Sequence, residues 1–227
     1  MRVVIAGGHG QIALRLERLL AARGDQPVGL IRKPAQIADV QAAGALVHVC
    51  DLEDTGVQEV SEALLGADAV VFAAGAGPGS GAERKKTVDQ DASALLADAA
   101  ERMGVRRFVQ ISSMGAGTAP DPGRGEVWAA YIEAKTRAEE DLRRRDLDWT
   151  IVRPGRLTGD PGAGLVRLAE PPVERGAVPR DDVAAVIAAL LPGTAGIKLT
   201  LELVSGDTPV EEAVRALAGM SPPRDRR

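Results

Sequence analysis

Tyr131, the only tyrosine in the chain, is followed four residues later by Lys135. On a helix this spacing places both side chains on one face, a single turn apart. A nearby cation favours the phenolate and lowers a phenol pKa that starts near ~10. Tyr131 could then pass a proton to a carbonyl oxygen as the carbonyl accepts a hydride. The alternative, which composition alone favours, is a surface Tyr–Lys pair on a charged helix.

Two serines directly follow the predicted strand at 106–111. The carboxyl end of such a strand should lie at the edge of the sheet where α/β proteins bind ligands. The hydroxyl of Ser113 could orient a substrate carbonyl or the phenol, and Ser112 is a competing candidate. Alternatively, both serines only satisfy backbone groups at the strand end.

A glycine turn lies near the N-terminus, between an apolar run at 2–6 and an amphipathic helix pattern that begins at Ile12. Gly8, Gly10 and Ala13 fit the G-x-G-x-x-G/A dinucleotide fingerprint. In this motif the glycines permit a tight turn and a close approach to pyrophosphate, and the helix N-terminus offers N–H groups and a positive dipole end. A tight turn without a ligand is the alternative. A P-loop is excluded because no Gly-Lys-Ser/Thr follows.

The residues after the second and third predicted strands bear on the cofactor. Arg32 and Lys33 follow the strand at 26–31, where NAD-binding proteins carry an acidic residue for the ribose 2′-hydroxyl. An arginine there can pair with a 2′-phosphate, so NADP(H) is favoured over NAD(H), with a solvated loop pair as the alternative. Asp51, after the strand at 45–50, lies where adenine is expected, but it could equally cap a turn or a helix.

Strands and helices alternate along the chain and must position these residues. The predicted strands are 2–6, 26–31, 45–50, 68–75, 106–111, 149–152 and 197–204, with a short one at 165–168. The first predicted helix begins at Ile12 and the last at Thr208. Five further helices are predicted between these two, at 35–43, 57–65, 83–103, 126–145 and 179–191. This alternation indicates an α/β fold, a Rossmann-type doubly wound parallel sheet flanked by helices.

Several element ends carry recognisable signals. The small residues Ala73, Ala74 and Gly75 end the fourth strand and would let its backbone pack beside a cofactor. The sequence Arg153-Pro154-Gly155 is expected to stop the sixth strand. Asp181 or Asp182 is expected to cap one helix. Thr208 is expected to cap the last helix, with Pro209 at its first position.

Bulk properties set the class of protein. The 227 residues are 45% hydrophobic but only 2% aromatic, so Val, Leu, Ile and Ala must build the core of one domain at 1–220, with a frayed tail at 221–227. A net charge of -4 argues against nucleic-acid binding. The lone Cys50, the lack of a membrane-length apolar run and the lack of a signal peptide together suggest a cytoplasmic protein. No metal site is predicted.

Taken together, these stretches resemble the atypical NAD(P)H-binding branch of the short-chain dehydrogenase/reductase superfamily. This branch includes flavin and biliverdin reductase-like proteins, regulators of nitrogen metabolite repression, and epimerase/dehydratase-like chains. The resemblance rests on residues 7–13, 32, 51–52, 73–75, 88–89, 112–113, 131–135 and 149–155.

The resemblance implies a role for each matching residue. Those implied to bind the cofactor are Gly7, Gly8, Gly10, Gln11 and Ile12 at the pyrophosphate, Arg32 at the 2′-phosphate, Asp51 and Leu52 at the adenine, Ala73, Ala74 and Gly75 along the adenosine, and Pro154 near the nicotinamide. Ser112 is a further cofactor-binding candidate. Ser113, Tyr131 and Lys135 would be the catalytic set, with Lys135 also on the nicotinamide ribose. A small substrate region would come mainly from 155–180 and 193–220.

The expected activity is NADP(H)-dependent hydride transfer to a small carbonyl, quinone or flavin-like acceptor. One alternative is a non-catalytic NADP(H)-sensing regulator, and another is an NAD-dependent sugar epimerase or dehydratase. The helices at 83–103 and 126–145 could pair two subunits, so a homodimer is a further expectation.

Overall fold

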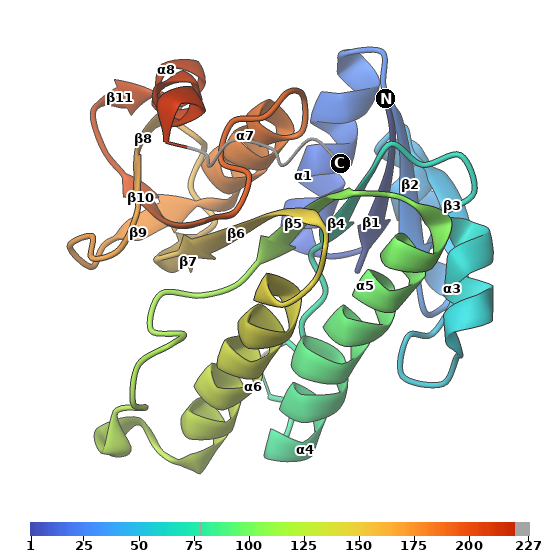
Figure 1. The fold of residues 1–227 in the computed structure, drawn as a ribbon, viewed down its shortest axis with the longest axis horizontal. Coiled ribbons are helices and arrows are strands. Elements are labelled where there is room, and N and C mark those ends of the chain that lie inside the picture. The colour runs from blue at the N-terminus through green and yellow to red at the C-terminus, as the bar shows by residue number, and fades with distance from the viewer. Residues whose placement is uncertain (78, 221–227) are drawn as a thin grey trace.

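A nine-stranded, mostly parallel sheet forms the centre of the computed structural model, which describes residues 1–77 and 79–220 (Figure 1). The strand order is β11-β8-β10-β6-β5-β4-β1-β2-β3. Every neighbouring pair from β10 to β3 is parallel, whereas β8 runs antiparallel to both β10 and β11. The strands are β1 Arg2–Ala6, β2 Gln26–Ile31, β3 Leu46–Val49, β4 Ala69–Phe72, β5 Arg107–Ile111, β6 Asp148–Pro154, β8 Leu165–Ala169, β10 Leu199–Ser205 and β11 Thr208–Pro209. The predicted α/β fold class is confirmed.

Helices cover both faces of this sheet (Figure 1). The longer helices are α1 Gln11–Ala22, α2 Ile37–Ala42, α3 Val57–Ala63, α5 Ala92–Met103, α6 Glu126–Arg143, α7 Arg180–Leu190 and α8 Val210–Ala216. Short turns of helix are η1 Pro34–Gln36, α4 Ala82–Arg84, η3 Pro122–Arg124 and η4 Leu217–Gly219. Among the described residues, every helix is too short or too polar to span a bilayer.

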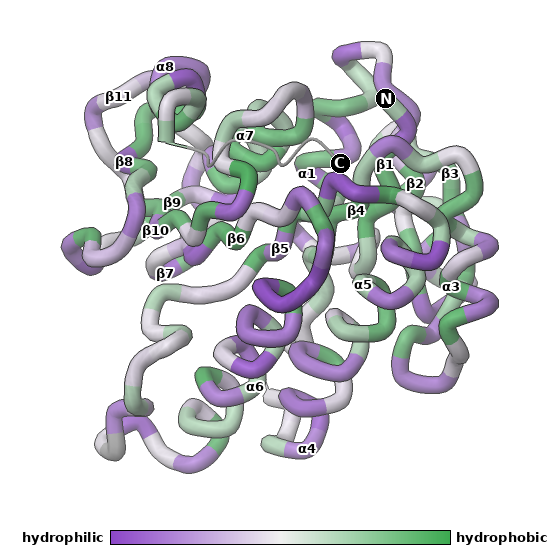
Figure 2. Tube along the Cα trace, viewed as in Figure 1, coloured by the Kyte–Doolittle hydropathy of each residue, from purple (hydrophilic) through white to green (hydrophobic). Residues whose placement is uncertain are grey.

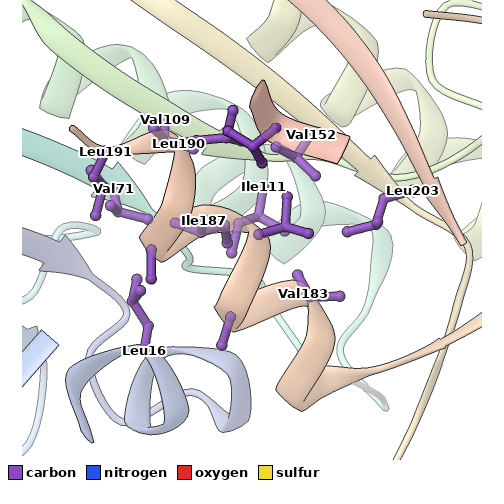
Figure 3. Close-up of a cluster of buried hydrophobic side chains, with 14 of the residues drawn as sticks. Leu16, Val71, Val109, Ile111, Val152, Val183, Ile187, Leu190, Leu191 and Leu203 are labelled. Atoms are coloured by element: carbon purple, nitrogen blue, oxygen red, sulfur yellow. The ribbon is translucent and has the colours of Figure 1, made fainter. Parts of the chain in front are cut away.

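The two-residue period of the strands divides the core into two halves. In β1, Val3 and Ile5 pack with α1 and α7, while Val4 and Ala6 pack with α3 and α5 on the opposite face. Figure 3 shows side chains of α1 and α7 meeting those of the sheet. Hydrophobic residues dominate the central strands, and hydrophilic stretches mark the outside of α6 (Figure 2). Branched aliphatic side chains and alanines fill most of both halves, and Phe72, Phe108 and Trp149 join them in the half that packs against α3 and α5.

The helix predicted at 83–103 is interrupted. Between α4 and α5 the chain forms a π-helical segment, η2, over Lys85–Asp91. The apolar period of this region continues through the interruption, so periodicity alone could not predict it. π-Helical turns are rare and occur often at functional sites.

Two strand ends also differ from the prediction. β4 stops at Phe72, because its neighbour β1 ends at Ala6 and only the Ala73 N–H still reaches the Ala6 carbonyl, at 3.0 Å. β6 continues through Pro154, which aligns with Leu203 of β10. The sixth strand therefore ends at Pro154, two residues beyond its predicted end at 152.

Both predicted helix caps are wrong. Pro179 is the N-cap of α7, and the carboxylates of Asp181 and Asp182 instead accept hydrogen bonds from backbone N–H groups at 162–164. Thr208 pairs with Val166 in the sheet, so the last helix begins only at Val210. In each case a tertiary partner replaces the local one.

The chain after β6 both extends the sheet and covers its edge. β7 Arg156–Thr158 and β9 Ala177–Pro179 form a separate two-stranded parallel sheet. Residues 193–220 contribute β10, β11 and α8, and none of these residues lines either cavity of the site described below. The tail expected to fray, 221–227, lies outside the described residues.

Candidate functional site

Two adjoining cavities lie at the carboxyl edge of the sheet. Their volumes are about 250 Å³ and about 920 Å³, and both are lined by Gly10 and residues 73–76. The other lining residues include those that directly follow β2, β3, β5 and β6. This is the edge at which open α/β sheets bind ligands.

The glycine turn after β1 borders both cavities, and its glycines have different roles. Gly7 has the left-handed conformation, with φ at 77°, and a Cβ there would lie 2.6 Å from the Cα of Ala74. The N–H of Gly10 donates to the Gly7 carbonyl at 2.7 Å. Gly7, which precedes the first glycine of the fingerprint, therefore makes the tight turn.

Gly8 is the only predicted site residue that lines neither cavity among the described residues. It is buried, and a Cβ at Gly8 would lie 2.6 Å from the Cα of Gly29 in β2. Its small size thus lets the turn pack on the sheet. Gln11 and Ile12, at the start of α1, do line the larger cavity, so the positive end of the helix lies at the cavity wall.

The smaller cavity contains the residues predicted for the adenosine half of the cofactor. Arg32, Asp51 and Leu52 all line it. Asp51 accepts a hydrogen bond from the N–H of Glu53 at 3.1 Å and so closes a turn. It does not cap a helix, because α3 begins at Val57 with Gly56 as its N-cap.

Glu53 and Arg84, which the sequence interpretation missed, complete this cavity. The Glu53 carboxylate is bound by Arg84 and accepts from the Thr87 hydroxyl at 2.7 Å. One of its oxygens also lies 3.7 Å from a guanidinium nitrogen of Arg32. The hydrogen bond from Arg84 keeps the pKa of Glu53 below its usual value, so an ionised carboxylate holds two arginines beside the cavity.

Lys135 is buried in the wall of the larger cavity, with only 4% of its surface exposed. Its Nζ lies 3.0 Å from Oδ1 of Asp89, donates to the Ile111 carbonyl at 3.2 Å and lies 5.8 Å from the ring centroid of Tyr131. The alternative of a surface Tyr–Lys pair is therefore wrong. Burial by itself lowers the pKa of Lys135, but the Asp89 carboxylate, together with Tyr131 and Glu139, raises it, and the net shift is upward.

The π-helical segment η2 supplies two further groups that the sequence interpretation left out. Asp89 is buried, and its second oxygen accepts from the N–H of Ala76 at 3.2 Å. Lys85 donates to the Gly77 carbonyl at 2.9 Å, and its Nζ lies 5.3 Å from the centroid of Tyr131. The tyrosine ring thus has an ammonium group near it from each of two helical segments. The pair 88–89 carried part of the family resemblance, and this was the one available signal for Asp89.

The two serines after β5 are in different environments. Ser112 is buried, and its hydroxyl donates to the Glu139 carboxylate, which also accepts from Nε of Arg153 at 2.9 Å. Ser113 is half-buried, and its hydroxyl forms one long hydrogen bond within the described chain, of 3.4 Å to the Met114 carbonyl. Both line the larger cavity together with Tyr131 and Pro154, but Ser113 has the more available hydroxyl.

Comparisons with known proteins place this geometry in a family. Residues 7–193 match the model of the NAD(P)H-binding family. The chain is 35% identical over 218 residues to "Uncharacterized sugar epimerase YhfK" of Bacillus subtilis, covering 96% of this chain and 100% of that protein.

Two solved structures show the same similarity. One, described provisionally as an NAD-dependent epimerase/dehydratase from Bacillus halodurans, is 36% identical with a TM-score of 0.88, covering 96% of this chain and 100% of that one. The oxidoreductase ylbE from Lactococcus lactis is 25% identical with a TM-score of 0.80, covering 96% of this chain and 97% of that one. The glycine turn, the paired cavities and these matches lead to one conclusion: the chain belongs to the NAD(P)H-binding family of Rossmann-type, short-chain dehydrogenase/reductase-like proteins.

Proposed function

We propose that this protein is an NADP(H)-dependent reductase that transfers a hydride to a small carbonyl, quinone or flavin-like acceptor. The observation that carries the proposal is the position of Tyr131 in the wall of the larger cavity, near the buried Lys135–Asp89 pair. That cavity shares Gly10 with the cavity lined by Arg32. A tyrosine, a lysine and a serine therefore line the space into which the dinucleotide turn opens.

The residues of the turn fit a dinucleotide. Cβ atoms at Gly7 and Gly10 would lie 2.6 Å from the Cα of Ala74 and 3.0 Å from the Gly7 carbonyl oxygen, so only glycine leaves the backbone open there. Gly7, Gly10, Gln11 and Ile12 would hold the pyrophosphate at the start of α1. The bound nicotinamide would supply the hydride.

The side chains of the larger cavity would manage the proton. The Tyr131 hydroxyl would donate its proton to the acceptor oxygen as negative charge develops there. The ammonium group of Lys135 would stabilise the phenolate that remains, and Asp89 would keep this ammonium group charged and in place. Ser113 would hydrogen-bond the same acceptor oxygen and fix its orientation.

The preference for NADP(H) is supported by the charges around the smaller cavity. Arg32 and Arg84 both approach Glu53, the carboxylate that holds them there. A 2′-phosphate would bring more negative charge than Glu53 and offer a bidentate partner to a guanidinium group. Of the two carboxylates among the described lining residues of this cavity, Glu53 contacts both arginines, whereas Asp51 accepts from the N–H of Glu53.

The first test is oxidation of NADPH over a panel of quinones, aldehydes and flavins. We expect Tyr131→Phe to lower kcat for carbonyl acceptors about 10²–10⁴-fold, with little change in the Kd of NADPH. Glu133→Gln, an exposed change on the same helix, serves as the control and should behave as wild type. If the wild-type protein oxidises no NADPH with any acceptor, the reductase proposal fails. An unchanged rate in the tyrosine variant would remove Tyr131 as the acid, while direct hydride transfer to a flavin would still be allowed.

The names of the relatives favour one other candidate, an NAD-dependent sugar epimerase or dehydratase. Arg32 argues against it, because an arginine at this place suits NADP(H) better. Calorimetry decides between them, since tighter binding of NAD than of NADP would support the epimerase. A non-catalytic NADP(H) sensor would instead bind dinucleotide without turnover and retain a partner protein in a dinucleotide-dependent way.

A further inference from the structure

The larger cavity is strongly cationic in a chain whose net charge is -4. Its positively charged lining residues are Lys85, Arg124, Lys135, Arg156, Arg175 and Arg180. Asp89 is the only negatively charged residue among the described lining residues. Asp89 is already paired with Lys135 at 3.0 Å. The remaining positive charge therefore has no counterpart within the cavity wall.

Arg156 and Arg175 belong to the small β7–β9 sheet and the segment that leads into it. The Arg156 N–H donates to the Gly176 carbonyl at 2.9 Å, so the two arginines lie on adjacent stretches of chain. A guanidinium nitrogen of Arg175 lies 3.9 Å from the Cβ position of Gly115, two residues after Ser113. These arginines thus border the same side of the cavity as the serine proposed to orient the acceptor.

Neither the Arg156 nor the Arg175 guanidinium group pairs with a carboxylate of the described chain. Arg156 and Arg175 are both exposed, and neither forms an ion pair with any described acidic residue. Exposed arginines elsewhere in the described chain are divided: Arg106 pairs with Asp146 and Arg137 with Glu133, whereas others, such as Arg102 and Arg167, lie away from both cavities and form no ion pair. Unpaired guanidinium groups at the mouth of a cavity suit bidentate recognition of a carboxylate or a phosphate.

Two of the five aromatic residues of the chain also line this cavity. The rings of Trp128 and Tyr131 lie 5.4 Å apart, tilted by 42°. Arg124 covers the Trp128 ring, with its Cζ 3.4 Å from the centroid. In a protein with so few aromatics, this group provides a flat surface for a conjugated molecule.

The dinucleotide does not account for these charges. Its pyrophosphate is assigned to Gly7 and residues 10–12 and its 2′-phosphate to Arg32, which lines the other cavity. Arg156 and Arg175 instead come from the chain after β6, beyond the predicted nicotinamide neighbour Pro154.

We propose that the acceptor is a planar anion, whose carboxylate or phosphate is bound by Arg156 and Arg175 while its conjugated body lies against Trp128. This inference rests on the proposed reductase function, because it names the class of substrate taken at that site. Recognition of the charged group would place the reducible part of the molecule near Ser113 and Tyr131.

The test compares ligands that differ only by the anionic group. Riboflavin and flavin mononucleotide form the phosphate pair, and 2-naphthaldehyde and 6-formyl-2-naphthoate form the carboxylate pair. Their Kd values are measured by calorimetry with the full chain saturated with NADP⁺, so no turnover is required. We expect the charged member of at least one pair to bind about tenfold more tightly than its neutral partner. The pair with the larger difference identifies the anionic group.

The variant Arg156→Gln/Arg175→Gln should abolish that preference while changing the Kd of the neutral member less than about twofold. Arg102→Gln/Arg167→Gln is the matched control: it removes two exposed arginines that line neither cavity, and therefore changes the net charge equally. This control should retain the full preference. Thermal melting of both variants verifies that they fold.

The proposal is overturned if the two members of each pair bind equally, or if none of the four ligands binds with a Kd below about 1 mM. It is also overturned if both double variants lose the preference to the same extent, or if only NADP⁺ binding weakens in Arg156→Gln/Arg175→Gln. The two proposals fail separately. A charge preference without NADPH oxidation would refute the reductase alone, and equal turnover of charged and neutral acceptors would refute the anion site alone.

Discussion

At the scale of single residues, the Lys135–Asp89 pair is the most demanding feature of the site. Both side chains are almost fully buried, and removal of a charge from water is costly unless a partner compensates for it. The pair joins η2 to α6, and the Ile111 carbonyl ties Lys135 to β5 as well. These contacts fix the position of Lys135 one helical turn from Tyr131.

Loss of Asp89 should therefore destabilise the whole protein. We expect Asp89→Asn to lower the free energy of unfolding by about 3–5 kcal/mol, because it leaves the Lys135 ammonium group buried without a counter-charge. The measurement is urea denaturation at pH 7. The double variant Asp89→Asn/Lys135→Met should recover much of the loss. A loss below about 1 kcal/mol in the single variant would show that the pair is not desolvated as described.

A second buried carboxyl, Glu17, has no such partner. It lies in α1 beneath the glycine turn and is fully buried, and neither of its oxygens accepts a hydrogen bond from the described residues. A Cβ at Gly29 would lie 2.8 Å from its Oε1, so the sheet packs directly on the carboxyl group. Burial raises the pKa of Glu17 to about 8.

This shift predicts a pH dependence of stability. Between pH 4.5 and about 8 the folded chain keeps a proton on Glu17 that the unfolded chain releases, so the free energy of unfolding falls as pH rises. The slope attributable to Glu17 is about 1.4 kcal/mol per pH unit at most. Glu17→Gln should remove it, and the difference between wild type and variant in urea melts across this range measures it. A difference that does not vary with pH would mean that Glu17 is ionised in the fold.

At the scale of elements, the β7–β9 sheet depends on a pair of glycines. A Cβ at Gly155 would lie 2.3 Å from the carbonyl oxygen of Gly176, which is backbone and cannot simply rotate away. The close approach aligns Arg156 with Ala177 across the two strands. Glycine is thus required at the point where the chain leaves the main sheet and enters the mouth of the cavity.

Gly155→Ala should therefore cost about 1–3 kcal/mol of stability and separate the two strands. Gly159→Ala is the control, because its Cβ would meet nothing within 4 Å. That change should fall within about 0.5 kcal/mol of wild type. Thermal denaturation compares them. Equal stability of the two variants would contradict the tight packing of β7 on β9.

The elements also show what could be predicted from the sequence. Strands β1, β2, β5 and β10 were predicted because a run of branched apolar residues between glycine and polar signals is nearly sufficient to define a buried strand. The π-helical segment was not, since its apolar spacing is that of an ordinary helix. The predictions that Asp181 or Asp182 and Thr208 cap helices were wrong because the partners of these residues, at 162–164 and in β8, are distant in sequence.

The same distinction applies to the site. Gly10, Arg32, Tyr131 and Lys135 belong to short local patterns that a reader of the sequence can recognise. Glu53, Arg84 and Arg175 reach the cavities only through the packing of separate elements, and no local pattern predicts this, while Asp89 was signalled only by the family resemblance at 88–89. Local spacing therefore predicted the glycine turn better than it predicted the other residues that line the two cavities.

At the scale of the whole molecule, a dinucleotide bound along the cleft would connect both cavities and should stabilise the fold. NADPH at one hundred times its Kd would add about 2.7 kcal/mol, which corresponds to a rise in Tm of roughly 5–10 °C for a chain of this size. NADH at equal concentration should produce a smaller rise. Differential scanning fluorimetry measures both.

A matched pair of variants tests whether Arg32 causes the difference between the Tm shifts with NADPH and with NADH. Arg32→Gln should bring the two Tm shifts close together, whereas Lys33→Gln, which changes an exposed neighbour that lines neither cavity, should preserve their difference. A larger shift with NADH than with NADPH in the wild-type protein would contradict the assignment of Arg32 to a 2′-phosphate.

The uneven distribution of charge has a kinetic consequence. The surface as a whole repels anions, but the field inside a cation-lined hollow with walls of low dielectric constant attracts them at short range. The Debye length is about 8 Å at physiological ionic strength, so this attraction acts only on molecules already near the opening. Association of a charged acceptor would accordingly slow as salt is added, while association of an uncharged one would not.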